Sequence, residues 1–176
     1  LHQGCQDAGR QQGDADRAQI EVTACKKLSL RDGHNQQTEG HDAEVVLHGE
    51  KLEESSAHAH MIAERRGLVF VHPFDDPLVM VGPGTVALEI FENATHIDTL
   101  VVPVGGGLIS GCAVAASRVA PKCDIVGVQA ELYPSMKATL MGDPIVADGD
   151  TLVAGIAVKF PVTNTVPIVL KLVSDV

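Results

Sequence analysis

The sequence is poor in aromatic residues. Its 176 residues include no Trp, one Tyr and four Phe, although 45% of them are apolar. A hydrophobic core must therefore consist mainly of Val, Ile, Leu and Ala, which suits buried parallel strands covered by helices better than an all-β sandwich. A chain of this length buries roughly two thirds of its unfolded surface, so it can form an ordinary domain without disulfides or metals.

Basic residues are scarce relative to acidic ones. Thirteen Lys and Arg residues stand against 23 Asp and Glu residues, which gives a formal net charge of −10. Proteins that bind nucleic acids normally present a basic face to the phosphate backbone. The charge balance therefore argues against a nucleic-acid partner.

Long apolar runs and paired cysteines are also absent. The most apolar stretch, residues 100–116, is interrupted by a proline, four glycines and a serine, whereas a membrane span needs about 18 or more apolar residues in succession. No basic region followed by an apolar segment occurs at the N-terminus. The eight His residues supply no zinc pattern around the four cysteines, and no C-x-x-C pair occurs. We expect no membrane segment, reduced thiols and a cytoplasmic location. The cysteines are Cys5, Cys25, Cys112 and Cys123.

The composition changes near residue 42. Residues 1–41 contain seven Gln, five Gly and only five residues of the Val, Ile, Leu, Met and Phe set. This segment is therefore poorly defined, with little material for a packed face, and only residues 20–28 are compatible with a helix. From Ala43 onward the pattern is that of an α/β protein.

Strands and helices alternate after residue 42. Runs of β-branched and apolar residues predict four strands, at 44–48, 68–71, 99–104 and 124–129. Helix-forming residues predict three helices, at 50–66, 86–91 and 108–119, the second with Thr85 as its N-cap. The strand at 99–104 is apolar almost throughout, so we expect it to be buried on both faces. The alternation predicts an α/β fold with a parallel sheet, right-handed crossovers and covering helices.

Three consecutive glycines, Gly105, Gly106 and Gly107, separate the strand 99–104 from the helix 108–119. Each glycine costs conformational entropy, and a tight turn that needs positive φ usually requires only one. Successive glycines let backbone N–H groups converge at a helix N-terminus, where the partial positive charge favours a phosphate. The loop therefore predicts a phosphate-binding site, and a tight turn is the alternative.

Residues alone leave the phosphate ligand open. Gly105, Gly107 and Gly111 can be read as a degraded dinucleotide fingerprint, with Glu131 near the position of a ribose-binding acid. The spacing departs from G-x-G-x-x-G, and no Lys-Ser/Thr pair follows the glycines. A dinucleotide-binding oxidoreductase domain remains one alternative.

Five motifs occur in the order found in one enzyme family. They are EVVLHG at 44–49, GLVFVHPFDDP at 67–77, GPGT at 82–85, VPVGGGL at 102–108 and GIAV at 155–158. Over residues 42–176 the chain resembles the pyridoxal-phosphate-dependent threonine dehydratases, or threonine ammonia-lyases. These enzymes have the tryptophan-synthase-β-like fold, known as fold type II.

The resemblance implies an activity, a cofactor and a site. Such an enzyme converts L-threonine, or L-serine, into a 2-oxo acid and ammonia, with pyridoxal 5'-phosphate as the electron sink; its place is in amino-acid metabolism, including isoleucine biosynthesis. The resemblance implies that the amides of Gly105, Gly106, Gly107 and Leu108 hold the cofactor phosphate and that Gly155 lies beside the ring. The family loop has four glycines before the leucine, whereas this chain has three.

The resemblance also implies a domain organisation. Residues 42–72 would be part of the smaller α/β domain and residues 73–176 part of the larger, cofactor-binding α/β domain, while residues 1–41 are not family-like. Gly84 and Thr85 would belong to a loop near the substrate.

The family's Schiff-base lysine has no counterpart in the sequence. The family carries it in a Ser-Phe-Lys motif well upstream, and no such motif precedes residue 42. Ser135-Met136-Lys137 is similar in its letters but follows the glycine loop, so Lys137 is expected on the surface, as is Lys159.

We therefore expect a truncated family member without catalytic residues, inactive as it stands. The alternative is a non-catalytic phosphate-ligand-binding or regulatory module. Apolar surface exposed by truncation would favour a homo-oligomer.

A metal site is a weaker interpretation of the polar residues. His72, Asp75 and Asp76 offer metal ligands within five residues, but the prolines around them make a turn the simpler explanation. His58 and His60 lie two apart on a predicted helix and so face different directions, which argues against a shared metal. We expect no metal.

Overall fold

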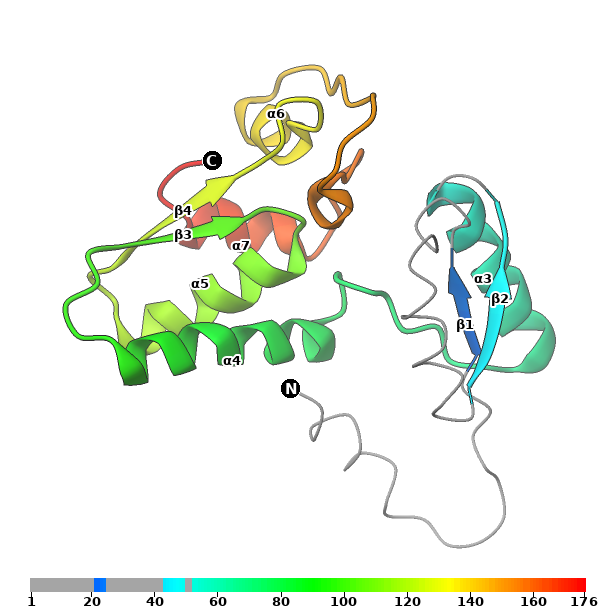
Figure 1. Ribbon diagram of the computed structural model, residues 1–176, viewed down its shortest axis with the longest axis horizontal. Helices are drawn as coiled ribbons and strands as arrows, with labels where there is room; N and C mark the ends of the chain where they lie inside the picture. The colour runs from blue at the N-terminus through cyan, green and yellow to red at the C-terminus, as the bar shows by residue number, and fades with distance from the viewer. Residues whose placement is uncertain (1–20, 25–42, 50–51) are drawn as a thin grey trace, which may run out of the picture. The chain divides into compact units, whose positions relative to one another are not determined.

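The computed structural model describes residues 21–24, 43–49 and 52–176. The chain divides into two compact units, His2–Val71 and His72–Val176, each of which is described by itself (Figure 1). Among the described residues, the first contains a pair of parallel strands and one helix, and the second contains a pair of parallel strands and several helices. This confirms the predicted α/β class with a parallel sheet.

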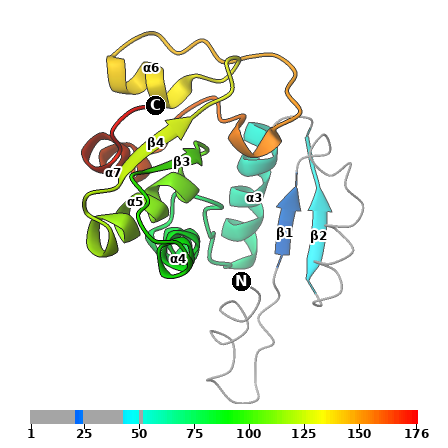
Figure 2. The ribbon, with the colours of Figure 1, turned by 60° about the vertical axis from the view of Figure 1, so that its left-hand side comes forward.

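In the first unit, the strand β1 (Glu21–Ala24) pairs in parallel with β2 (Glu44–Leu47). The helix α3 (Leu52–Arg66) contacts β1 and runs beside the strand pair (Figure 2). The predictions for β2 and α3 are confirmed where the structure describes them; residues 50 and 51 lie outside the described residues. A helix across 20–28 is wrong for residues 21–24, because β2 offers these residues a parallel partner and pairing outweighs their weak helix pattern.

The histidines of the first unit contact different partners. His58 stacks on His48 with ring centroids 3.9 Å apart, and His60 stacks on Phe70 at 3.8 Å. The prediction that His58 and His60 face different directions is thus confirmed.

The strand predicted at 68–71 is absent from the structure. These residues have no strand conformation and pair with no strand among the described residues, and Val69 is 88% exposed. Strand propensity expresses packing on a sheet rather than an intrinsic backbone preference, so an unpaired run of such residues stays irregular.

In the second unit, β3 (Thr99–Pro103) pairs in parallel with β4 (Asp124–Val128), and α5 (Gly107–Val119) connects them. All three elements confirm the predicted order of strand, glycine loop, helix and strand. The last residues extend the pairing: Ser174 N donates to Ile125 O at 2.8 Å, and Gly127 N donates to Asp175 O at 2.7 Å.

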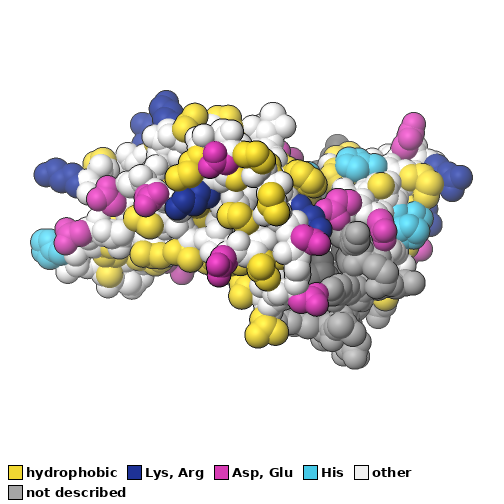
Figure 3. Space-filling view, turned by 90° about the horizontal axis from the view of Figure 1, so that it is seen from above, with side chains coloured by type: hydrophobic (Ala, Val, Ile, Leu, Met, Phe, Trp, Pro, Cys, Tyr) yellow, Lys and Arg dark blue, Asp and Glu magenta, His cyan; other side chains and the backbone are white. Residues whose placement is uncertain are grey.

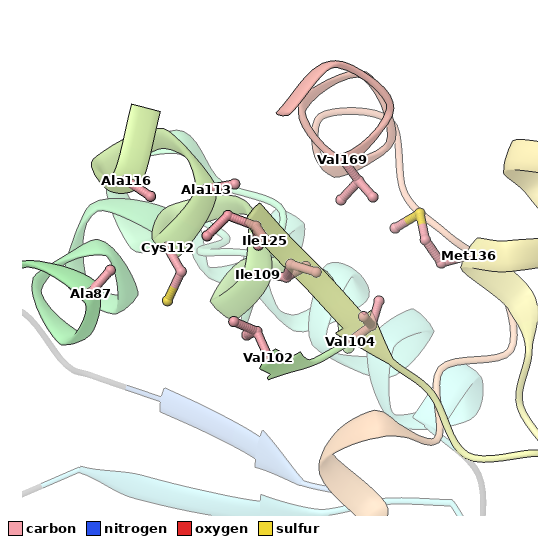
Figure 4. Packing of buried hydrophobic residues seen from close by; sticks show 10 residues of the cluster. All are labelled: Ala87, Val102, Val104, Ile109, Cys112, Ala113, Ala116, Ile125, Met136 and Val169. Atoms are coloured by element: carbon pink, nitrogen blue, oxygen red, sulfur yellow. The ribbon is translucent and has the colours of Figure 1, made fainter. Parts of the chain in front are cut away.

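The core lies on one face of this strand pair. The buried residues come from the strands, from α5, from α7 (Thr165–Leu172) and from neighbouring helices (Figure 4). Side chains that alternate with them point away, so that Val101 is 59% exposed and Val128 is 49% exposed. The expectation that the strand at 99–104 is buried on both faces is therefore wrong for β3. The core residues of the described helices pack on one face of the strand only. The cluster is Ala87, Val102, Val104, Ile109, Cys112, Ala113, Ala116, Ile125, Met136 and Val169.

The helix α4 (Pro77–Asn93) begins earlier than predicted. Asp76 is its N-cap: the Oδ1 atom accepts hydrogen bonds from Leu78 N at 2.7 Å and Val79 N at 3.4 Å, and Pro77 occupies the first helical position. Thr85 is not a cap but lies inside the helix, where its Oγ1 donates to Gly82 O at 2.7 Å. The Asp-Pro pair is a stronger start signal than a lone threonine.

Replacement of Asp76 by alanine is expected to destabilise this unit by about 1 kcal/mol, because two N–H groups of α4 lose their acceptor. Asp76→Asn is the matched control, since asparagine caps helices as well as aspartate does. Urea unfolding measures both. Equal losses in the two variants would contradict the assignment of the cap.

The helices α4 and α5 approach so closely that glycine is required between them. A Cβ atom on Gly111 would overlap Met80 O and lie 2.7 Å from Gly84 N, and a Cβ on Gly84 would lie 3.2 Å from Gly111 O. Gly84 and Thr85 therefore belong to a helix that packs on α5 and not to a loop, which corrects the expectation drawn from the family.

Cys112 lies in this contact between α4 and α5. Its Sγ is 3.7 Å from Pro83 O, its side chain is buried, and burial raises the pKa of the thiol. Cys112 and Cys123 are both free thiols, as predicted, while Cys5 and Cys25 lie outside the described residues.

Alkylation is expected to spare Cys112 in the folded protein, because a buried neutral thiol is a poor nucleophile. Peptide mapping after iodoacetamide treatment near neutral pH should find Cys112 unmodified in buffer and modified in concentrated urea. Full modification of Cys112 in buffer would contradict its burial.

The surface is mixed in character. On the face shown in Figure 3, hydrophobic side chains are dispersed among acidic and basic ones. None of the helices in the described ranges is both long and apolar enough to cross a membrane.

Candidate functional site

The glycine loop joins the end of β3 to the start of α5. Gly106 is the N-cap of α5 and has φ of 123° and ψ of −72°, in the left-handed region that favours glycine. Gly107 and Leu108 are the first two residues of the helix. The structure thus places the four predicted phosphate-binding residues together at a helix N-terminus, where the dipole favours an anion.

Close neighbours explain why the other two glycines carry no side chain. A Cβ atom on Gly105 would lie 2.5 Å from Gly155 O, and one on Gly107 would lie 2.8 Å from Phe74 O. Only Gly106 of the three has positive φ, so the tight-turn alternative accounts for one glycine and packing accounts for two.

The loop leaves hydrogen-bond donors unused. The N–H groups of Gly105, Gly106, Gly107 and Leu108 donate to no backbone carbonyl of the described residues, as expected for the first turn of a helix. Ser110 Oγ, in the next turn, is buried and has no hydrogen-bond partner in the described part of the chain. A cluster of free N–H donors at a helix N-terminus fits a phosphate group.

A small open hollow lies next to the loop, at the carboxyl ends of β3 and β4. It is bordered by α6 (Ser135–Met141) and by the segment after the short 3-10 helix η1 (Ala154–Ile156). Ser135 Oγ donates to Val158 O at 2.6 Å and so ties α6 to that segment. Among the described residues, no Lys or Arg lines the hollow. The lining residues are Val104, Gly105, Gln129, Ser135, Met136, Val158, Pro161 and Thr165.

The turn before α4 is built by hydrogen bonds to side chains. His72 Nδ1 accepts from Phe74 N at 3.3 Å and from Asp75 N at 2.9 Å, and the His72 ring meets the Phe74 ring edge to face at 4.7 Å. Asp76 caps α4. In the residues that the structure covers, no three His, Cys, Asp or Glu side chains gather in a way that could hold a metal ion.

Other residues singled out from the sequence lie apart from the loop. Lys137 is exposed, and its backbone N–H donates to Gln129 Oε1 at 3.0 Å. Lys159 Nζ lies 2.7 Å from Asp148 Oδ1 in an ion pair. Glu131 is exposed in the turn after β4. Gly155, by contrast, contacts the loop through Gly105, as described above.

Two residues at the loop were not predicted as site residues. Phe74 packs on Gly106 and Gly107, and Thr165 reaches Gly106 from α7. Phe74 lies within the HPFDDP motif, which is a signal that could have pointed to it. Nothing in the sequence around Thr165 indicates this contact.

Comparison with known proteins identifies the family. The profile of the family described as "Pyridoxal-phosphate dependent enzyme" matches residues 15–176. The chain belongs to this family. The match begins at residue 15, whereas the motifs shared with the threonine dehydratases were found only from residue 42 onward. Membership in the pyridoxal-phosphate dependent enzymes favours pyridoxal phosphate over a dinucleotide as the ligand, and it confirms the predicted fold type II architecture.

Threonine ammonia-lyases are among the relatives. The chain is 44% identical over 142 residues to the L-threonine ammonia-lyase of Geobacter sulfurreducens, a match that covers 79% of this chain and 35% of that protein. It is 40% identical over 139 residues to L-threonine dehydratase catabolic TdcB of Escherichia coli K12, covering 77% of this chain and 42% of the relative.

A solved structure supports the same family. The processed form of threonine deaminase isoform 2 from Solanum lycopersicum aligns with a TM-score of 0.77 and 29% identity, covering 89% of this chain and 46% of that chain. The chain thus spans less than half the length of these relatives.

Proposed function

We propose that this chain supplies the cofactor-phosphate site of an L-threonine ammonia-lyase. The observation that carries the proposal is the set of four N–H groups at the N-terminus of α5, from Gly105 to Leu108, which find no acceptor among the described residues. Family membership names the phosphate ligand that such a site would hold, namely pyridoxal 5'-phosphate.

The chain's own residues would bind and orient the cofactor. The N–H groups of the loop donate to the phosphate oxygens, and the dipole of α5 stabilises their charge without a Lys or Arg side chain. When bound, the pyridine ring supplies the electron sink for loss of the α-proton and of hydroxide from L-threonine, which yields 2-oxobutanoate and ammonia.

Finer assignments belong to the same proposal. We propose that residues 42–72 are part of the smaller domain and residues 73–176 part of the larger one; the division of the chain after Val71 supports this.

The names of the relatives support L-threonine as the substrate, with L-serine as the alternative. We propose that the protein acts in isoleucine biosynthesis and is located in the cytoplasm. Exposed apolar side chains, Val101 and Val128 among them, support a homo-oligomer.

The proposal predicts binding without turnover by this chain. Equilibrium dialysis should show saturable binding of 4'-deoxypyridoxine 5'-phosphate, which keeps the phosphate and ring but has no aldehyde to react with surface lysines. Excess inorganic phosphate should displace it. No binding would contradict the proposed site.

Turnover is measured separately. The chain with pyridoxal phosphate and L-threonine is expected to release no 2-oxobutanoate, since the family's cofactor-binding lysine has no counterpart before residue 42. Release of 2-oxobutanoate, with a lysine fixed to the cofactor by borohydride, would overturn this expectation.

A further inference from the structure

Asp75 connects two segments that are distant in the sequence. Its Oδ1 accepts hydrogen bonds from Asn164 N at 3.0 Å and from Thr165 N at 3.1 Å. Its Oδ2 lies 3.4 Å from Asn164 N and 3.3 Å from Asn164 Nδ2, and Asn164 Nδ2 also donates to the Asp75 carbonyl at 2.7 Å. Asn164 itself provides no side-chain cap for α7. The carboxylate of Asp75 therefore caps α7 from 90 residues away.

The residues on both sides of this contact reach the same glycine. A Cβ atom on Gly106 would lie 3.2 Å from Cδ2 of Phe74, the residue directly before Asp75. It would lie 3.4 Å from Cγ2 of Thr165. Thr165 is fully buried at 0% exposure. Gly106 is thus held between Phe74 and Thr165, and Asp75 ties these two residues together.

Gly106 is also the residue whose backbone decides where the loop N–H groups point. It is the N-cap of α5, has positive φ, and accepts the hydrogen bond of Ser110 N through its carbonyl at 3.1 Å. Movement of Phe74 or Thr165 would release it from its neighbours.

We propose that Asp75 is a positioning residue for the phosphate-binding loop: by capping α7 across the turn at 72–76, it clamps Gly106 between Phe74 and Thr165. The proposal rests on the proposed function for its ligand, but the clamp itself is a property of the free chain. Asp75 touches no ligand and acts only through these two residues.

Three versions of the full chain test the clamp: the natural sequence, Asp75→Ala, and Val169→Ala. Val169 lies in the buried core on α7, at 1% exposure, so its replacement weakens the packing of α7 and leaves the carboxylate contacts intact. Hydrogen exchange without ligand should show faster exchange of the Ser110 amide, which donates to Gly106 O in the loop, in Asp75→Ala but not in Val169→Ala. Equal exchange at the loop in both variants would overturn the proposal.

Ligand binding gives the second readout. Asp75→Ala is expected to weaken binding of 4'-deoxypyridoxine 5'-phosphate about tenfold, because the loop N–H groups are then less well aligned on the phosphate, whereas Val169→Ala changes it by less than about twofold. Asp75→Asn, which keeps an acceptor oxygen, should restore part of the affinity. If the natural chain does not bind the phosphate, the proposed function fails, and the exchange measurement still decides the clamp. Equal affinities in Asp75→Ala and the natural chain would overturn the role in binding.

Discussion

Replacement of Gly111 by alanine is expected to unfold the unit His72–Val176 or to destabilise it by about 3 kcal/mol or more. The added Cβ would overlap Met80 O and come within 2.7 Å of Gly84 N, and both atoms belong to the backbone of α4. A side chain could rotate away, but a helix backbone cannot move without separating α4 from α5. The loss is large against the total stability of a typical domain, about 5–15 kcal/mol.

Gly82→Ala is the matched control for this prediction. Gly82 also lies on α4, the helix that packs on α5, but a Cβ atom on Gly82 meets nothing within 4 Å. Alanine in a helix is favoured over glycine by about 0.5–1 kcal/mol, and its position before Pro83 offsets this gain, so this variant should change stability by less than about 1 kcal/mol. Thermal unfolding followed by circular dichroism compares the two. A Gly111→Ala variant as stable as the natural chain would disprove the close helix contact.

Replacement of Gly106 by alanine is expected to weaken the binding of phosphate ligands about a hundredfold. Alanine rarely adopts φ of 123°, and its Cβ would press on Phe74 Cδ2 at 3.2 Å. The loop must then change its backbone, so the N–H groups no longer converge. Loss of one charge-assisted hydrogen bond, worth about 1.5–3 kcal/mol, accounts for an effect of this size, since a hundredfold change in affinity is about 2.8 kcal/mol.

Gly142→Ala separates backbone strain from loss of the site. Gly142 also has positive φ, at 74°, but it ends α6 and a Cβ there meets nothing within 4 Å. This variant should lose stability and keep its affinity for 4'-deoxypyridoxine 5'-phosphate in a dialysis assay. If the two variants lose affinity equally, strain and not the loop explains the effect.

Local signals predicted the centre of the fold well. The strands at 99–104 and 124–129, the glycine loop and the helix between them follow from short apolar runs and the glycines, each readable within a few residues. The start of α4 was misplaced, although the Asp76-Pro77 pair that sets it is also a local signal. Thr85 is a typical N-cap residue by type, but here it lies in mid-helix.

Contacts between distant segments could not be predicted. Whether residues 68–71 form a strand depends on a partner strand, which the segment does not encode. The exposure of Val101 depends on which faces the helices cover. Asp75 and Asn164 are 89 residues apart, and their hydrogen bonds arise only once α4 and α7 are both in place around the loop.

Binding of the cofactor phosphate by the amides of the glycine loop is the proposed role of this chain. Its most direct test is the backbone N–H spectrum of the isotopically labelled chain, titrated with 4'-deoxypyridoxine 5'-phosphate and, separately, with 4'-deoxypyridoxine, which has no phosphate. We predict that the resonances of Gly105, Gly106, Gly107 and Leu108 shift with the phosphorylated compound only. Unchanged loop resonances at saturating ligand, or shifts confined to other residues, would contradict the claim.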